Sequence, residues 1–328
     1  MKYREIKISA LFSGVLCFIA SSGLCQELTP SEKAASNQIC VAQYVSHPAL
    51  DAVYEGFLET VFKSGIKADR IRFANVAGDA VAARSLADQF CGDKNCVVVY
   101  SLATPMSQSV KQSCGKKPVV FGAITDPISA NLVSNFERPG GNLTGTSDQW
   151  PYALQMEMIA TVWGKGTVVG VPFNPGEANT RYAMEKTREG AKAVGLKLLE
   201  VPINSPSEAL QSVESMVGRS RVVYIPADNT AMAAAKGIIT AAKRHGITVI
   251  AGDPGTFDAG AAIGLGVSYR DLGVVNATQI GSIFHGKPVG DISVGVSDHP
   301  LLMIDEKRAR EVNIDVSKLR NWYAARTK

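Results

Sequence analysis

The stretch VVFGAITDPISANLV, residues 119–133, decides how the chain is interpreted. Its apolar first part is typical of a buried strand, and that run stops at Thr125-Asp126-Pro127. Asp followed by Pro is typical of the first turn of a helix, because the carboxylate accepts from free backbone N–H groups and proline has none to leave unpaired. The stretch therefore predicts a strand that passes into a helix over 126–136, with Asp126 as the cap.

The same unit of strand and helix recurs along the chain. The first half contains strands predicted at 39–45, 71–77, 96–104 and 118–125, and the second half contains strands predicted at 167–173, 196–203, 221–227 and 247–252. Strands that alternate with helices predict α/β domains built on parallel sheets with helices on both faces. A chain of 328 residues is long enough for two such domains.

Domain boundaries follow from composition. Residues 137–151 are rich in Gly, Pro, Asn and Thr, which suits a crossover between two domains. A further strand at 261–268 and its helix come after the second series is complete, and we expect both to return to the first domain. The predicted division is a first lobe of 26–145 plus about 258–290, and a second lobe of 146–257 plus about 291–328.

The first 25 residues have the features of an export signal. A basic start, MKYREIK, precedes a short apolar run, ISALFSGVLCFIA, and then small residues around a cleavage site. The run is too short to span a bilayer comfortably. We predict a signal peptide over 1–25, cleaved near Cys25, and a periplasmic protein. Lipid modification of Cys25 is the alternative, which bulky Leu24 before it disfavours.

Four cysteines remain after the signal peptide, and an even number in an exported protein suggests disulfides. Cys91 and Cys96 bracket the tight loop CGDKNC, so we expect a local bridge between them and a second bridge between Cys40 and Cys114. Spacing leaves the other two connectivities open. The spacings match no zinc-finger pattern and no histidine lies near, so no metal is expected.

Other function classes lack their signatures. The net charge is only +4 and no arginine-rich face stands out, so nucleic acid is not an expected partner. No serine lies in a G-x-S-x-G elbow, and the phosphate-loop-like GSIFHGKP ends in proline where the magnesium-binding Ser or Thr would be. We therefore expect no enzymatic activity and no cofactor.

Polar residues follow the predicted strands at the points where they end. They are His47, Thr104, Thr125, Asp126, Asp228, Asn229, Thr230 and Asp253. In parallel sheets, ligands bind outside the carboxyl ends of the strands, where helix N-termini present N–H groups to an anion such as a carboxylate. An aspartate there suits a ligand ammonium, because a buried charge must be paired. The pattern predicts a cleft for a small polar metabolite.

The chain also resembles a known family. The segments HPALDAVYEGF, VVFGAITDPISANLVSNFERPGGNLTGTSD, FNPGEANT, YIPADNT, VIAGD and GVSYRDLG together resemble the tryptophan/tyrosine-type ABC-transporter substrate-binding proteins. This resemblance spans the mature chain. It implies a type 1 periplasmic-binding fold of two doubly wound parallel-sheet lobes joined by three hinge crossovers. It also implies an amino acid or similar small ligand, a membrane permease and an ATPase as partners; we expect a monomer.

Carried onto this sequence, the resemblance implies a set of cleft residues. They are Tyr44, Thr104, Thr125, Asp126, Asn142, Thr144, Asp228, Asn229, Thr230, Asp253 and Tyr269. In this interpretation Thr104, Thr125 or Thr144 takes a carboxylate, and Asp228 or Asp253 takes an amino group. Trp150 either stacks on the ligand or covers the hinge.

Two departures from the family pattern leave the ligand open. Asn131 stands where the family usually has glycine, and Ala227 stands where it often has threonine. A binding protein that signals to a receptor, a sugar binder and a periplasmic hydrolase remain the alternatives.

Overall fold

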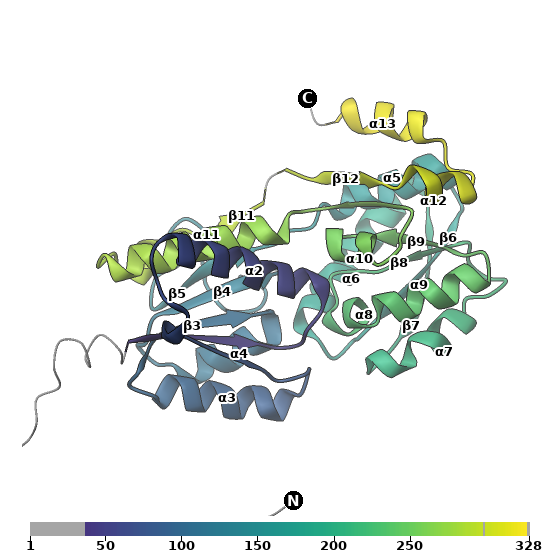
Figure 1. The fold of residues 1–328 in the computed structure, drawn as a ribbon. Coiled ribbons are helices and arrows are strands. Elements are labelled where there is room, and N and C mark those ends of the chain that lie inside the picture. Colours follow the sequence, from purple (N-terminus) through teal and green to yellow (C-terminus); the bar gives the residue numbers. More distant parts are fainter. Residues whose placement is uncertain (1–36, 298, 327–328) are drawn as a thin grey trace, which may run out of the picture.

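The computed structural model describes residues 37–297 and 299–326, so the predicted signal peptide lies outside the described residues. Two α/β lobes lie side by side (Figure 1). The first contains a six-stranded sheet in the order β11-β5-β4-β3-β1-β2, and the second a six-stranded sheet in the order β12-β10-β9-β8-β6-β7. The predicted two-lobe α/β architecture is confirmed.

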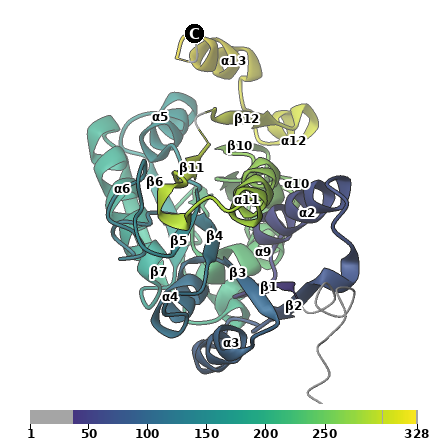
Figure 2. The same ribbon diagram turned by 90° about the vertical axis from the view of Figure 1, so that its left-hand side faces the viewer.

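All strand pairs of the first sheet are parallel. Its strands are β1 (Gln38–Gln43), β2 (Ile71–Asn75), β3 (Cys96–Leu102), β4 (Val119–Ile124), β5 (Leu143–Ser147) and β11 (Gly295–Val296). Helices cover both of its faces, with α2 and α11 on one side and α3 and α4 on the other (Figure 2). These helices are α2 (Pro48–Lys63), α3 (Ala80–Gly92), α4 (Thr104–Ser113) and α11 (Tyr269–Phe284). Every residue of β4 is buried as a result, which explains its continuous apolar sequence.

The second sheet is parallel except for the pair β10–β12. Its strands are β6 (Val168–Phe173), β7 (Lys197–Pro202), β8 (Val222–Tyr224), β9 (Thr248–Ala251), β10 (Ile263–Gly266) and β12 (Leu301–Ile304). Its helices are α5 (Tyr152–Trp163), α6 (Ala178–Val194), α7 (Ala209–Glu214), α8 (Asn229–Ala233), α9 (Ala235–Arg244), α10 (Pro254–Asp258), α12 (Glu306–Glu311) and α13 (Val316–Ala324). Short 3-10 turns are η1 (Ala68–Arg70), η2 (Pro206–Glu208) and η3 (Val289–Asp291). No helix of the described residues is both long and apolar enough to cross a membrane.

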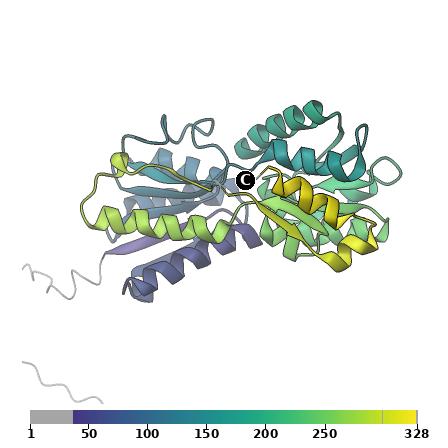
Figure 3. The same cartoon turned by 90° about the horizontal axis from the view of Figure 1, so that it is seen from above.

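Three segments connect the lobes, after β5, after β10 and after β11 (Figure 3). The chain crosses at these points because β10 belongs to the second sheet whereas α11, which follows it, packs against α2 of the first lobe. The prediction that the strand at 261–268 returns to the first lobe was therefore wrong, and only its helix does so. The later strand β11, expected in the second lobe, pairs with β5 of the first.

The close packing of α2 against α11 brings the start of each helix to the cleft. A Cβ at Gly56 would lie 2.1 Å from the backbone oxygen of Arg270, and a Cβ at Gly273 would lie 1.9 Å from that of Val53. Glycine is thus required at both contacts, since any side chain would push the helices apart. With this packing, α11 begins at Tyr269 beside the first turn of α2.

The connection from β4 to β5 differs from the prediction. The helix expected over 126–136 is absent, and turns replace it. Asp126 does cap the first of them, accepting from the backbone N–H groups of Ile128 and Ser129 at 2.8 and 2.9 Å. The chain leaves the helical conformation at Asn131, whose φ is +56°.

The disulfides differ from the expected pairing. Cys40 is bonded to Cys96, and Cys91 to Cys114. The physical reason is that β1 and β3 are adjacent parallel strands, which places Cys40 beside the start of β3. Cys91 lies in the last turn of α3, which packs on α4, and Cys114 is the residue that ends α4. The short loop between Cys91 and Cys96 therefore directs its two cysteines to different partners.

Removing the bridge between Cys91 and Cys114 is expected to lower the free energy of unfolding by about 2 to 3 kcal/mol. The bond closes a loop with a sequence separation of 23, and the unfolded chain gains the entropy of that loop when it opens. Urea denaturation of a Cys91→Ala/Cys114→Ala variant measures the loss. A midpoint equal to that of the wild type would contradict the prediction.

Candidate functional site

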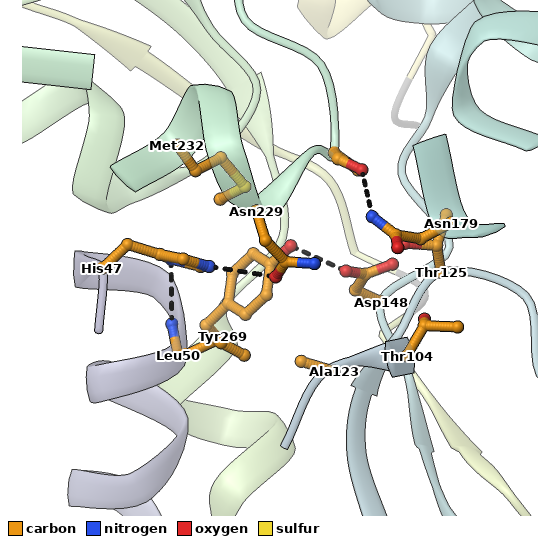
Figure 4. Close-up of a pocket in the computed structure, with 11 residues that line it drawn as sticks. His47, Leu50, Thr104, Ala123, Thr125, Asp148, Asn179, Asn229, Met232 and Tyr269 are labelled. Atoms are coloured by element: carbon orange, nitrogen blue, oxygen red, sulfur yellow. Dashed lines mark hydrogen bonds between the residues drawn. The ribbon is translucent and has the colours of Figure 1, made fainter. Parts of the chain in front are cut away.

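A cavity lies between the lobes, at the carboxyl ends of the strands of the first sheet (Figure 4). It contains about 270 Å³ of space between atoms, part of it open to solvent. Its lining is His47, Leu50, Thr104, Ala123, Thr125, Asp148, Asn179, Ala227, Asn229, Met232 and Tyr269. Both lobes contribute residues, so the separation of the lobes controls access to the cavity.

Asp148 supplies the only carboxylate of this lining. It follows β5 directly and is only 3 % exposed. One oxygen, Oδ2, accepts from the Tyr269 hydroxyl at 2.7 Å, whereas Oδ1 has no hydrogen-bond partner among the residues that the structure describes. Burial, assisted by the charge of Asp253, raises the pKa of Asp148 to about 6, although the Tyr269 bond acts to lower it. Among the described residues, no lysine or arginine lines the cavity to neutralise this group.

The Tyr269 hydroxyl connects two of the crossovers. It donates to Asp148 and accepts from the indole Nε1 of Trp150 at 2.7 Å. Trp150 is 3 % exposed and covers Gly252 so closely that a Cβ there would lie 1.9 Å from its ring. Trp150 is therefore packed at the hinge and is not part of the cavity lining, which favours the hinge role over stacking on a ligand.

The start of α4 lies at the cavity, which Thr104 lines. Its N-cap residue, Ala103, makes no side-chain cap bond, unlike the residues that cap α2, α8, α10 and α11. Ala103 has φ 77° and ψ 154°, a conformation that costs a non-glycine residue about 1–3 kcal/mol. Ala123, at an irregularity in β4, has φ +56°. A strained residue thus lies close to each of two threonines that line the cavity. Ala103 directly precedes Thr104, and Ala123 lies two residues before Thr125.

The second lobe contributes amides held by buried acids. Glu177, just before α6, accepts from the backbone and side-chain amides of Asn229 and from the side-chain amide of Asn179. Asp228 caps α8 and also accepts from Thr180 at 2.6 Å. Burial and the charge of Glu177 raise the pKa of Asp228 to about 7. The Oδ1 atom of Asn179, which lines the cavity, has no hydrogen-bond partner.

Four of the predicted cleft residues line the cavity, namely Thr104, Thr125, Asn229 and Tyr269. Five others do not line it: Tyr44, Asp126, Asp228, Thr230 and Asp253. Thr230 donates to Glu177, while Asp228 and Asp253 cap helices. Asp253 is 1 % exposed and its Oδ2 atom has no partner. Asp228 uses its oxygens within the second lobe, so the structure does not bring it into the cavity.

Asn142 and Thr144 lie away from the cavity. Both are at the amino end of β5, where the Asn142 side chain donates to Lys117 and the Thr144 hydroxyl donates to Ile292. They were expected in an irregular crossover, but a strand begins there, and the crossover follows only after Ser147. The carboxyl end of that strand carries Asp148 instead.

Several lining residues were missed by the sequence analysis. Asp148 was missed because its strand had been assigned to the crossover, although it belongs to the same pattern of polar residues at strand ends. His47 had been noted at a strand end but was not among the predicted cleft residues.

The departure at Asn131 has a conformational explanation, since asparagine tolerates the positive φ that glycine provides elsewhere. The described residues contain no cluster of His, Cys, Asp and Glu that could hold a metal ion.

Comparison with known proteins agrees with this architecture. The family model described as ABC transporter substrate binding protein matches residues 38–328. A tyrosine-binding protein of Clostridioides difficile is 30 % identical over 323 residues, covering 95 % of this chain and 93 % of the relative.

Two solved structures differ in how closely they match this one. An ABC domain from Streptococcus pneumoniae in complex with L-Trp is 28 % identical, with a TM-score of 0.80 over 86 % of this chain and 98 % of that chain. A ligand-free, open substrate binding protein with adhesive properties from Clostridium difficile is 30 % identical but has a TM-score of only 0.63, over 85 % and 95 %. At nearly equal identity, this structure superposes better on the ligand complex than on the open, ligand-free protein. The chain belongs to the ABC transporter substrate binding protein family.

Proposed function

We propose that the protein is the extracytoplasmic solute-binding component of an ABC importer and captures an amino acid between its lobes. Tryptophan and tyrosine are the first candidates, because they are the ligands in the names of two relatives. The protein holds its ligand and catalyses no reaction.

The observation that carries this proposal is the unpartnered oxygen of Asp148. A buried carboxylate without a cationic neighbour is costly unless a ligand supplies the charge. An ammonium group bonded to Oδ1 would give a charge-assisted hydrogen bond while Oδ2 keeps its bond from Tyr269. Asp148 thus replaces Asp228 as the residue assigned to the amino group.

The remaining lining suits the other parts of an amino acid. The free N–H groups at the start of α4 and the hydroxyls of Thr104 and Thr125 would bind the carboxylate. Leu50 and Met232 offer apolar surface to the side chain, and the polarisable methionine sulfur packs well against an aromatic ring.

Export and partners complete the proposal. Residues 1–25 would direct the chain out of the cytoplasm and be cleaved near Cys25, which leaves a periplasmic monomer; the oxidised cysteine pairs suit that compartment. A membrane permease with its ATPase would receive the ligand from the closed form.

The test is a titration calorimetry screen of the twenty amino acids against the mature protein. We expect one ligand per chain with micromolar affinity, about −8 kcal/mol. Tryptamine and tyramine lack the carboxylate, and the corresponding arylpropionates lack the amine, so each should bind much more weakly than the amino acid. Binding of a sugar, with no response to any amino acid, would contradict the proposal.

A further inference from the structure

His47 forms a hydrogen bond that crosses from one lobe to the other. It is the residue before α2 in the first lobe and is 4 % exposed. Its Nε2 atom lies 3.3 Å from Oδ1 of Asn229, in the first turn of α8 in the second lobe (Figure 4). The adjacent Pro48 contacts Gly255 of the second lobe. These contacts exist only while the lobes are closed.

The first turn of α2 determines which nitrogen of His47 carries the proton. The backbone N–H of Leu50 donates to Nδ1, so Nδ1 must be unprotonated. The single proton of the neutral ring is then on Nε2, which donates to Asn229. The side-chain amide of Asn229 in turn donates to Glu177. The three residues form a chain of bonds that runs in one direction, from the first lobe into the second.

We propose that His47 is a latch that holds the lobes closed only while its imidazole is neutral, so that acid opens the cleft and releases the ligand. This proposal rests on the proposed function, because it concerns the closure that accompanies ligand capture.

A protonated His47 does not fit the closed form. A proton on Nδ1 would point at the Leu50 N–H, which removes the cap of α2 and sets two donors against each other. The ring would also carry a charge in a buried position. Consistent with this geometry, burial lowers the pKa of His47 to about 4, against the opposing influence of the Asn229 bond and Asp51.

Acids surround His47, but within the described part of the chain none of them forms an ion pair with it. Asp51 on the same helix accepts instead from Gln43 and Ser46. In the second lobe, Glu177 and Asp228 bind the start of α8, and Asp253 caps α10. In the cavity, Asp148 is bonded to Tyr269. None of these acids therefore holds the proton on the ring when the lobes close.

The sign of the pH effect follows from linkage. In an open form, with His47 in water, the pKa returns to about 6.5, whereas closure lowers it, so closure becomes less favourable as pH falls below about 6.5. These two pKa values of His47, in the open and the closed form, correspond to a loss of affinity of about 30-fold between pH 7.5 and 5.0. The buried carboxyl of Asp148 acts in the opposite direction on closure without ligand, because its raised pKa favours closure in acid.

The experiment compares the wild type with His47→Asn, which can still cap α2 but cannot be protonated in this range. The matched control is His285→Asn at the exposed end of α11. Calorimetry with L-tryptophan or L-tyrosine gives Kd from pH 7.5 to 5.0. Single-molecule fluorescence transfer between labels on the two lobes gives their separation without added ligand.

We expect the wild type and His285→Asn to lose affinity for the amino acid and to open as pH falls. We expect His47→Asn to bind several-fold more weakly than the wild type at pH 7.5, and its loss of affinity between pH 7.5 and 5.0 to be at least tenfold smaller. An unchanged pH profile in His47→Asn, or a lobe separation that responds to pH equally in His47→Asn and the wild type, would overturn the latch. If no amino acid binds at any pH, the proposed function fails, while the lobe separation without ligand still decides for or against the latch.

Discussion

Replacing Asp148 with asparagine is expected to weaken the binding of an amino acid by about 100-fold or more. The change preserves the shape of the side chain and its contact with Tyr269, but removes the charge that pairs with a ligand ammonium. Loss of one partner of a buried charge pair costs about 2–5 kcal/mol, because the other charge is left uncompensated. Calorimetry at pH 7.5 with the ligand found for the wild type measures the change.

The matched control is Asp315→Asn, at the start of α13. Asparagine can accept the same bond from the backbone N–H of Lys318, and Asp315 does not line the cavity, so the affinity of this variant should stay within about threefold of the wild type. Equal affinity in Asp148→Asn and the wild type would show that Asp148 does not hold the ammonium.

The sequence was sufficient for the lobes and most strands because buried parallel strands are continuous apolar runs, as in β3 and β4. It was insufficient for β5, whose sequence LTGTS resembles a linker. Packing explains this composition. A Cβ at Gly145 would lie 1.9 Å from the backbone oxygen of Phe121, and the buried Thr146 hydroxyl donates to the side-chain oxygen of Asn276. Close approach and buried hydrogen bonds between distant segments leave no periodic signal.

The candidate site, like the strands, could be predicted only in part from the sequence. Polar residues after strands identified the correct edge of the first sheet, and Thr104 and Thr125 line the cavity there. The assignment of β5 to a crossover hid Asp148, which the same rule would have found. The disulfide pairing depended on which helices and strands are neighbours, and the short loop between Cys91 and Cys96 carried no information about that.

Introducing valine at Gly255 is expected to prevent full closure and to weaken ligand binding by roughly 100-fold, about 3 kcal/mol, at the upper end of the usual cost of overpacking. Gly255 lies in the first turn of α10, and a Cβ there would be 2.3 Å from Cβ of Pro48 in the other lobe. The proline ring cannot rotate away, so the lobes themselves must separate. Small-angle X-ray scattering with saturating ligand should show a larger radius of gyration than for the wild type.

Gly281→Val is the control for this change, because it places the same side chain in a helix where a Cβ meets nothing within 4 Å. The position of Gly255 also connects this variant to the latch. Pro48 follows His47 directly, so lobes held apart at Pro48 also separate His47 from Asn229. Once the second lobe no longer buries His47 in either form, its pKa does not fall on closure and it contributes nothing to the pH dependence. Gly255→Val should therefore bind weakly at pH 7.5 and show little acid effect, and a full wild-type pH profile in this variant would contradict a closure limited by these two residues.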